Sequence, residues 1–274
     1  MAQTPQSDGS GTRAGHELLV KSKTTHVKVP VTLKYIRMHA LPKYRHAHNF
    51  PSLTAAESSL LKDALGYVRA VFREFPPMDW VYEYFSNRGI EERNLALKMY
   101  EAKVKNQFEP HTWGTDTEPI VVRLYEDAGS ALFEIAYKYS VPISFIYTMA
   151  LAKGLSSIPQ TLPVDKDYLQ GLLSQLEARV DAARAWITRL DELVSMPPYL
   201  RVATLLEVGK AYTDDSIATL AMLAVVIHSG QSQAQRHRIV QDIIDRLLVE
   251  GYLQVVENRK GMYVCVKKYG DEDE

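Results

Sequence analysis

Apolar side chains recur at alternating spacings of four and three residues between Leu169 and Val194. This spacing has the 3.5-residue period of a heptad repeat, so it predicts a long helix over 165–195 with a continuous apolar seam. Such a seam must be covered, and it therefore constrains the rest of the fold. The seam residues are Leu169, Leu173, Leu176, Val180, Ala183, Ile187, Leu190 and Val194.

Two ways of covering this seam remain open. β-branched side chains at one seam position, with Leu at most of the others, favour a parallel coil between two copies of the chain. Leu172, Trp186 and Leu193 widen the apolar stripe, which favours packing inside one chain. Arg179 and Arg184 would also repel across a parallel dimer. We expect the homodimer, and its predicted contacts are Leu169, Leu173, Leu176, Val180, Ile187 and Leu190.

A strand, a helix and a second helix are predicted within 118–158. Residues 120–125 read as a short strand with Arg123-Leu124 near its end, Leu132 and Ile135 lie on the first helix, and a second helix is expected to begin near Ser144. This unit resembles the ribbon-helix-helix (MetJ/Arc-type) family of DNA-binding proteins. The resemblance implies that two copies pair their strands into an antiparallel ribbon that enters the major groove.

The same resemblance assigns roles to outward-facing residues of this unit. Side chains alternate along a strand, so Val121 and Arg123 face outward if Val122 and Leu124 face the helices. Arg123 could then bind a guanine edge and Val121 a thymine methyl group. Ser144 is the predicted N-cap of a helix whose backbone N–H groups could bind a phosphate. The other interpretation is a dimerisation module that does not touch DNA.

Residues 197–268 resemble a winged helix-turn-helix domain. Three helices are expected over 199–210, 215–226 and 232–250, with Thr213 or Asp214 capping the second. Two strands then flank a basic turn. The resemblance implies that the third helix and the wing contact DNA, while a role in protein–protein contacts is the alternative. The predicted DNA contacts are Gln233, Gln235, Arg236, His237 and Arg238 on the helix, and Arg259 and Lys260 on the wing.

The N-terminal part carries weaker signals. Residues 1–26 are predicted to be a disordered basic tail, and 27–117 a helical region of unknown role that could contact other proteins. Within that region we expect an edge strand over 27–36, a loop over 37–51 and a helix opened by a Thr54–Glu57 capping box. Two further helices (79–87 and 90–108) and a linker (109–119) follow. The long helix occupies 159–196, and 269–274 form an acidic tail.

Composition and motifs limit the classes of function that this chain can have. The net charge is −1, but the first fifty residues hold eight Lys or Arg against Asp8 and Glu17, which fits either a solvated terminus or a nucleic-acid partner. A lone cysteine excludes an internal disulfide, and no apolar run is long enough for a membrane span. No secretory signal, phosphate-binding loop or catalytic motif is recognisable. His46 and His48 could reach one metal, but no further ligand completes a set.

We therefore predict a mainly α protein with small β elements: a helical N-terminal region, a ribbon-helix-helix-like unit, a long helix and a winged-helix-like domain. The predicted function is sequence-specific binding of double-stranded DNA by a cytoplasmic, nucleoid-associated homodimer without catalysis, cofactor or metal. A transcriptional regulator or a plasmid or phage maintenance factor would fit. The alternative is a non-catalytic subunit of a larger assembly. An enzyme built on 27–117 would need a pocket that the sequence does not indicate.

Overall fold

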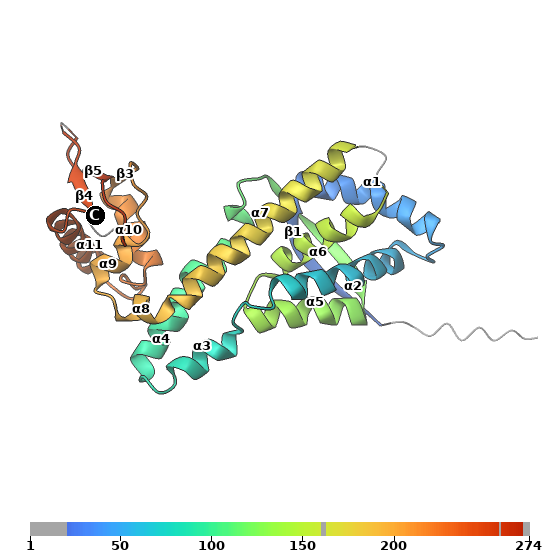
Figure 1. Cartoon of the computed structure of the whole chain (residues 1–274), viewed down its shortest axis with the longest axis horizontal. Helices are drawn as coiled ribbons and strands as arrows, with labels where there is room; N and C mark the ends of the chain where they lie inside the picture. Colours follow the sequence, from blue (N-terminus) through green and yellow to red (C-terminus); the bar gives the residue numbers. More distant parts are fainter. Residues whose placement is uncertain (1–20, 160–162, 258, 271–274) are drawn as a thin grey trace, which may run out of the picture.

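The computed structural model describes residues 21–159, 163–257 and 259–270 of the chain. The described part is mainly helical, with small antiparallel sheets, as the sequence predicts. Its buried apolar side chains form a large core, made by residues within 27–194 together with Val225, and a smaller core within 202–265. Figure 1 shows the long helix α7 (Pro163–Thr188) leading from the first unit towards the second. The predicted acidic tail from 271 onward and residues 1–20 lie outside the described residues.

The larger unit contains two successive strand–helix–helix segments. Strand β1 (Ser22–Pro30) is followed by α1 (Val31–Ala47) and α2 (Leu53–Val71), and strand β2 (Thr117–Tyr125) by α5 (Glu126–Tyr139) and α6 (Ile143–Ser157). The two strands pair with each other, antiparallel along their whole length, in a two-stranded ribbon. The predicted pairing of 120–125 with the same strand of a second chain is therefore wrong, because the partner strand comes from the same chain.

The first of these segments differs from its prediction. Residues 22–26 belong to β1 rather than to a tail, and residues 31–47 form a helix rather than a strand and a loop. The reason is the apolar spacing after Pro30, since Leu33, Ile36, Ala40 and Leu41 fall on one buried helical face. Pro42 lies inside this helix and does not end it.

Helix α2 also begins differently from the expectation. Its N-cap is Ser52, whose Oγ accepts a hydrogen bond from the N–H of Ala55 at 3.1 Å. The Thr54–Glu57 capping box does not form, because the Glu57 carboxylate is buried and bound to Arg37 and Tyr147. Further on, residues 109–119 are only partly a linker, because β2 starts at Thr117.

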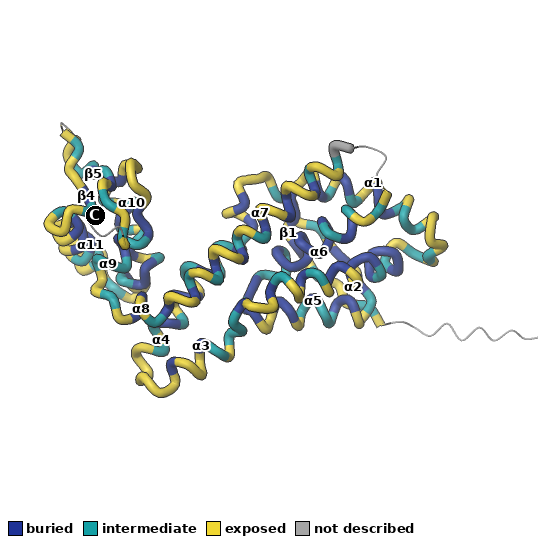
Figure 2. Tube along the Cα trace, viewed as in Figure 1, coloured by how far each residue is buried: buried dark blue, intermediate teal, exposed yellow. Residues whose placement is uncertain are grey.

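Helices α2 and α6 pack against each other at the centre of the larger unit. Helix α6 is buried on nearly all sides because α2, α5, α7 and β1 surround it. Figure 2 shows the buried positions concentrated in this region. At Gly154 the two helices approach so closely that an added Cβ would lie 2.7 Å from Leu60 Cγ. A small residue is therefore required at this crossing.

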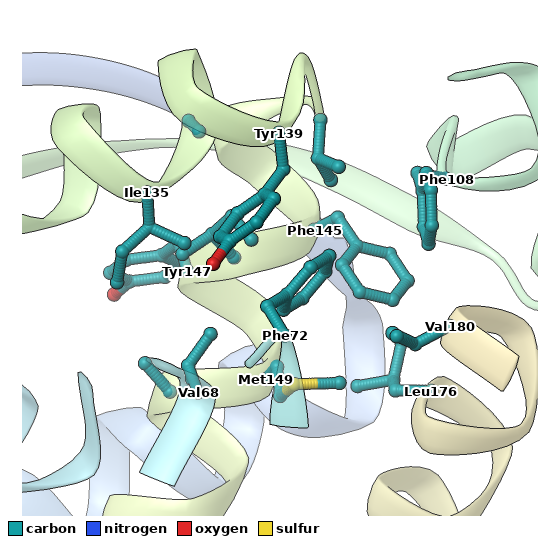
Figure 3. Close-up of a cluster of buried hydrophobic side chains, with 14 of the residues drawn as sticks. Val68, Phe72, Phe108, Ile135, Tyr139, Phe145, Tyr147, Met149, Leu176 and Val180 are labelled. Carbon is teal, nitrogen blue, oxygen red and sulfur yellow. The ribbon is translucent and has the colours of Figure 1, made fainter. Parts of the chain in front are cut away.

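Aromatic rings fill the space between α6 and its neighbours. Phe108 and Phe145 meet edge to face with their centroids 4.7 Å apart, and Phe72 stacks on Tyr139 at 5.1 Å. Figure 3 shows this cluster beside Leu176 and other side chains of α7. Ring pairs in these geometries add to the stability that their burial already provides.

One buried polar cluster joins α1, α2 and α6. The guanidinium of Arg37 donates two hydrogen bonds to the Glu57 carboxylate, at 2.8 and 2.6 Å, and the Tyr147 hydroxyl donates a third at 2.5 Å. Burial and the nearby Glu57 carboxylate raise the pKa of Tyr147 well above its ordinary value. Burial lowers the pKa of Arg37, but its interactions with Glu57 and Tyr147 together outweigh this effect, so the pKa of Arg37 rises. The cluster is therefore a charged pair with a neutral tyrosine.

The heptad seam of α7 packs inside the chain. Helix α7 contacts α6 and the π-helical turn η1 (Tyr100–Lys105), and a short helix α8 (Leu190–Ser195) continues it after Arg189. Arg179 donates to the backbone carbonyls of Gln107 and Thr112 in the same chain. The seam residues Leu169, Leu173, Leu176, Val180, Ile187 and Leu190 are all buried.

The predicted intermolecular coil through these residues is therefore wrong. Arg184, expected to repel its counterpart across a dimer, instead donates to the carbonyl of Val71. The width of the apolar stripe explains the outcome, because Leu172 and Leu193 are also buried and need more cover than one partner helix gives.

Short helices and turns lie near the junction between the two units and form contacts there. Helices α3 (Met78–Phe85) and α4 (Ile90–Met99) lead into η1, while a 3₁₀ turn η2 (Pro110–Thr112) precedes β2. Arg88 forms an ion pair with Asp191 of α8. Trp186 packs against both cores, and Lys103 lies over its ring at 4.8 Å. Burial lowers the pKa of Lys103.

The C-terminal unit runs α9 (Pro198–Ala203), β3 (Ala211–Thr213), α10 (Asp214–Leu223), α11 (Gln233–Val249), β4 (Leu253–Val255) and β5 (Met262–Cys265). Its sheet is antiparallel in the order β3-β5-β4. Thr213 caps α10 as predicted, and Ser232 caps α11. The first predicted helix, 199–210, is shorter than expected, because the chain turns at 204–210 and enters β3.

Candidate nucleic-acid interface

The outer side of the ribbon is an exposed surface that we call the ribbon face. Cross-strand neighbours share a face of a sheet, and three exposed pairs meet here: Thr24 with Arg123, His26 with Val121, and Lys28 with Pro119. The alternation is clear in β2, where Val121 is 59% exposed and Val122 is fully buried. The predicted outward orientation of Val121 and Arg123 is thus confirmed.

Cationic groups lie at both ends of the ribbon face. Lys28 and Arg123 project from opposite strands, and neither forms an ion pair in the described part of the chain. The Arg123 Nε donates to Ser22 Oγ at 2.8 Å, which leaves its two terminal nitrogens for other partners. None of the six side chains on this face is a carboxylate. The face therefore offers hydrogen-bond donors and positive charge to a ligand.

Ser144 has a different role from the predicted one. The N-cap of α6 is Pro142, so Ser144 lies within the first turn of the helix. Its Oγ accepts a hydrogen bond from the backbone N–H of Lys28 at 3.0 Å. Ser58 of α2 does the same for the N–H of Tyr125 at 2.9 Å. These bonds attach the ends of the ribbon to the helices beneath it, and Ser144 is thereby a positioning residue for Lys28.

A second candidate surface is the start of α11, and its predicted residues divide into two groups. Gln235 forms a capping box with Ser232, because its Oε1 accepts from the Ser232 N–H at 2.9 Å. Arg236 donates to the carbonyls of Gln231 at 3.1 Å and Ser229 at 2.7 Å. Both side chains therefore stabilise the turn before α11, and base contacts by them stay a prediction.

Gln233, His237 and Arg238 are exposed at the start of α11. Within the described residues, their side chains form no hydrogen bonds to the turn before the helix of the kind that Gln235 and Arg236 form. Gln233, His237 and Arg238 together define the α11 face. On the predicted wing, Arg259 and Lys260 are also exposed. Asp214 and Asp215, at the start of α10, line a shallow hollow of about 650 Å³ with Gln233 and His237. The acidic side of this hollow makes the α11 face less favourable for a polyanion than the ribbon face.

The sequence alone did not identify the β1 half of the ribbon face as a candidate contact surface. Thr24, His26 and Lys28 lie in a stretch whose inward positions include the polar residues Lys23 and Thr25, so the segment shows little apolar alternation. Val27 and Val29 reveal only the last part of the strand, which lies within the expected strand over 27–36. The signal that could have corrected its end is the helical spacing from Leu33 onward, directly after this Val-x-Val pair.

The described residues hold no cluster of three or more His, Cys, Asp or Glu side chains that could bind a metal ion. No helix in the same ranges is both long and apolar enough to cross a membrane. Comparison of the chain with protein-family models, curated proteins and solved structures finds no match.

Proposed function

We propose that this protein binds double-stranded DNA by placing the ribbon face in the major groove. A two-stranded ribbon fits that groove, and its outward side chains can reach base edges. The observation that carries the proposal is the ribbon face itself, which is exposed, free of carboxylates and bears Lys28 and Arg123 on opposite strands. The repeated strand–helix–helix order and the strand pairing support a ribbon-helix-helix unit formed within one chain.

The α11 face is the second proposed contact. The order of elements in the C-terminal unit and its β3-β5-β4 sheet support a winged-helix interpretation, in which the start of α11 approaches DNA. Arg259 and Lys260 would then contact backbone phosphates. The narrower predictions of a transcriptional regulator or of a plasmid or phage maintenance factor, and of nucleoid association, stay predictions.

Homodimerisation is not required by this proposal. The ribbon is complete in one chain, and the helix seam expected to join two chains is buried. The alternative of a non-catalytic assembly subunit has one observation in its favour, an open groove of about 870 Å³ between α3 and α5–α6. Met78, Tyr82 and Tyr137 line this groove, which could accept an apolar protein segment.

The test is DNA binding by the full chain over a range of salt concentrations. A protein that neutralises phosphates loses affinity steeply as salt rises, so log K should fall linearly with log salt. Arg123→Ala should weaken the best site by about 1–3 kcal/mol, while Lys28→Ala should reduce the salt slope by roughly one. Arg189→Ala is the matched control, because it removes the same charge from an exposed residue outside both faces.

A paired comparison tests the α11 face. Arg238 and Arg246 are both exposed on α11, near its beginning and its end. Arg238→Ala should weaken binding and Arg246→Ala should not, because the start of the helix approaches the groove. Absence of salt-dependent binding to any duplex would contradict the proposal and favour the assembly subunit. Equal affinity of the Arg123 variant and the Arg189 control would remove the ribbon face from it.

A further inference from the structure

The ribbon has an internal twofold relation. In the register of β1 and β2, His26 pairs with Val121, and these are the middle residues of two nine-residue strands. The two are 95 positions apart, and so are Val31 and Glu126, which begin the helices after the strands. A twofold axis through the His26–Val121 pair therefore relates the two strand–helix segments of the chain.

The inner side of the ribbon keeps similar residues at its two pairs of buried positions, although the less buried inward pairs, Lys23 with Glu118 and Thr25 with Ile120, differ. The twofold places Val27 on Val122 and Val29 on Leu124, and all four side chains are buried in the shared core. Each half thus contributes a similar apolar surface to the helices beneath it. Packing requires this likeness, because both halves cover the same layer of α2 and α6.

On the outer side, the residue types at equivalent positions of the two halves differ in all three cases. One half presents Thr24, His26 and Lys28, and the equivalent residues of the other half are Pro119, Val121 and Arg123, in that order. Thus a threonine corresponds to a proline, a histidine to a valine, and a lysine to an arginine. These six side chains are exposed, so core packing does not impose the difference.

From this difference we infer that the ribbon recognises a non-palindromic DNA site, with one chain bound to each site. A ribbon of two identical strands presents the same side chains to both half-sites, and its operator mirrors its twofold symmetry. Here the half-site at one end of the ribbon meets the arginine fork of Arg123, which suits guanine O6 and N7, beside the hydroxyl group of Thr24. The half-site at the other end meets Lys28 beside Pro119.

This inference rests on the proposed function and makes the centre of the site its most distinctive part. The His26–Val121 pair lies at the axis, so the middle base pairs face an imidazole on one strand and an apolar side chain on the other. The imidazole can donate or accept a hydrogen bond, whereas the valine offers only methyl groups. The two orientations of the duplex at this pair are therefore not equivalent. The bound chain should therefore have one preferred orientation on the site.

The experiment is a random-sequence DNA selection with the full chain and with a symmetrised variant. The variant carries Pro119→Thr, Val121→His and Arg123→Lys, so that both strands present the same outward triplet. Both proteins also carry Arg238→Ala, to reduce any asymmetry contributed by the α11 face. Light scattering of each protein with its selected duplex gives the number of chains per site.

We expect the first protein to select a site without inverted-repeat symmetry and to bind it as one chain. The symmetrised variant should select an inverted repeat and should bind the original site at least roughly tenfold more weakly, through loss of the guanine contact. An inverted repeat selected by the first protein, or an asymmetric site retained by the symmetrised variant, would overturn the inference while leaving DNA binding intact. Failure of both proteins to enrich any DNA would instead reject the proposed function, and this inference with it.

Discussion

The buried cluster of Arg37, Glu57 and Tyr147 provides a quantitative test of the packing, through the substitution Glu57→Gln. The Glu57 side chain is only 3% exposed, and it receives three hydrogen bonds from two partners. Glutamine has the same shape and keeps one acceptor oxygen, but its amide nitrogen would face a donor of Arg37. The substitution therefore leaves a guanidinium without its counter-charge in the core.

The expected loss follows from these contacts. A hydrogen bond to a charged group contributes about 1.5–3 kcal/mol, and breaking a buried ion pair costs about 3–5 kcal/mol. The Arg37 side chain is 20% exposed, so water can solvate part of the unpaired charge. We therefore expect Glu57→Gln to lower the free energy of unfolding by about 2–4 kcal/mol.

Urea unfolding followed by circular dichroism measures this loss, and Glu134→Gln is the matched control. Glu134 pairs with Arg69 at 3.0 Å, but both side chains are more than half exposed, so the control should cost at most about 1 kcal/mol. If both substitutions lowered the stability equally, the ion pair would not hold α1 against α2 as argued above. The slope of the transition should not change, since the substitution exposes no new surface.

Three further outcomes are expected. Gly154→Ala should destabilise the protein by about 1–3 kcal/mol because its Cβ meets Leu60, whereas Gly66→Ala on the open side of α2 should stabilise it by about 0.5–1 kcal/mol; urea unfolding distinguishes the two signs. Because burial and Glu57 raise the pKa of Tyr147, its contribution to stability is complete below the unfolded pKa of about 10 and falls as pH rises further; Tyr147→Phe should flatten that alkaline fall in the urea midpoint. Val180→Ala should lower the melting temperature equally at low and high protein concentration, whereas a coil between chains would make the loss depend on concentration.

Local signals in the sequence predicted much of the second strand–helix–helix segment and of the C-terminal unit. Within 120–125 the inward and outward sides of β2 were predicted correctly, because every second residue from Ile120 to Leu124 is a large apolar one. Thr213 marked the start of α10 because its hydroxyl accepts the Ser216 N–H. These predictions were correct because each depends only on residues within a few positions of one another.

The errors concern contacts between distant parts of the chain. A heptad seam has the same spacing whether it packs against a second chain or against α6, so Leu169 and its successors could not distinguish the two. Only the end of β1 fell within the expected strand over 27–36, because its inward Lys23 and Thr25 are polar. The helix that follows was not recognised because it contains Pro42. The local hydrogen bond of Arg236 to Ser229 was also not foreseen, because nothing in the sequence indicates it.

Placing both strands in one chain changes what the ribbon can do. A ribbon formed by two chains exists only above their dissociation constant, whereas β1 and β2 are held together by the helices of a single core at any concentration. In a two-chain ribbon every outward substitution occurs twice, so a change suited to one half-site is also imposed on the other. Here His26 and Val121 differ although they share an axis, and the buried Val27 and Val122 stay alike. Independent change on the outer face, with likeness kept at the buried inner positions, is the pattern expected where the core constrains one side and a ligand contacts the other.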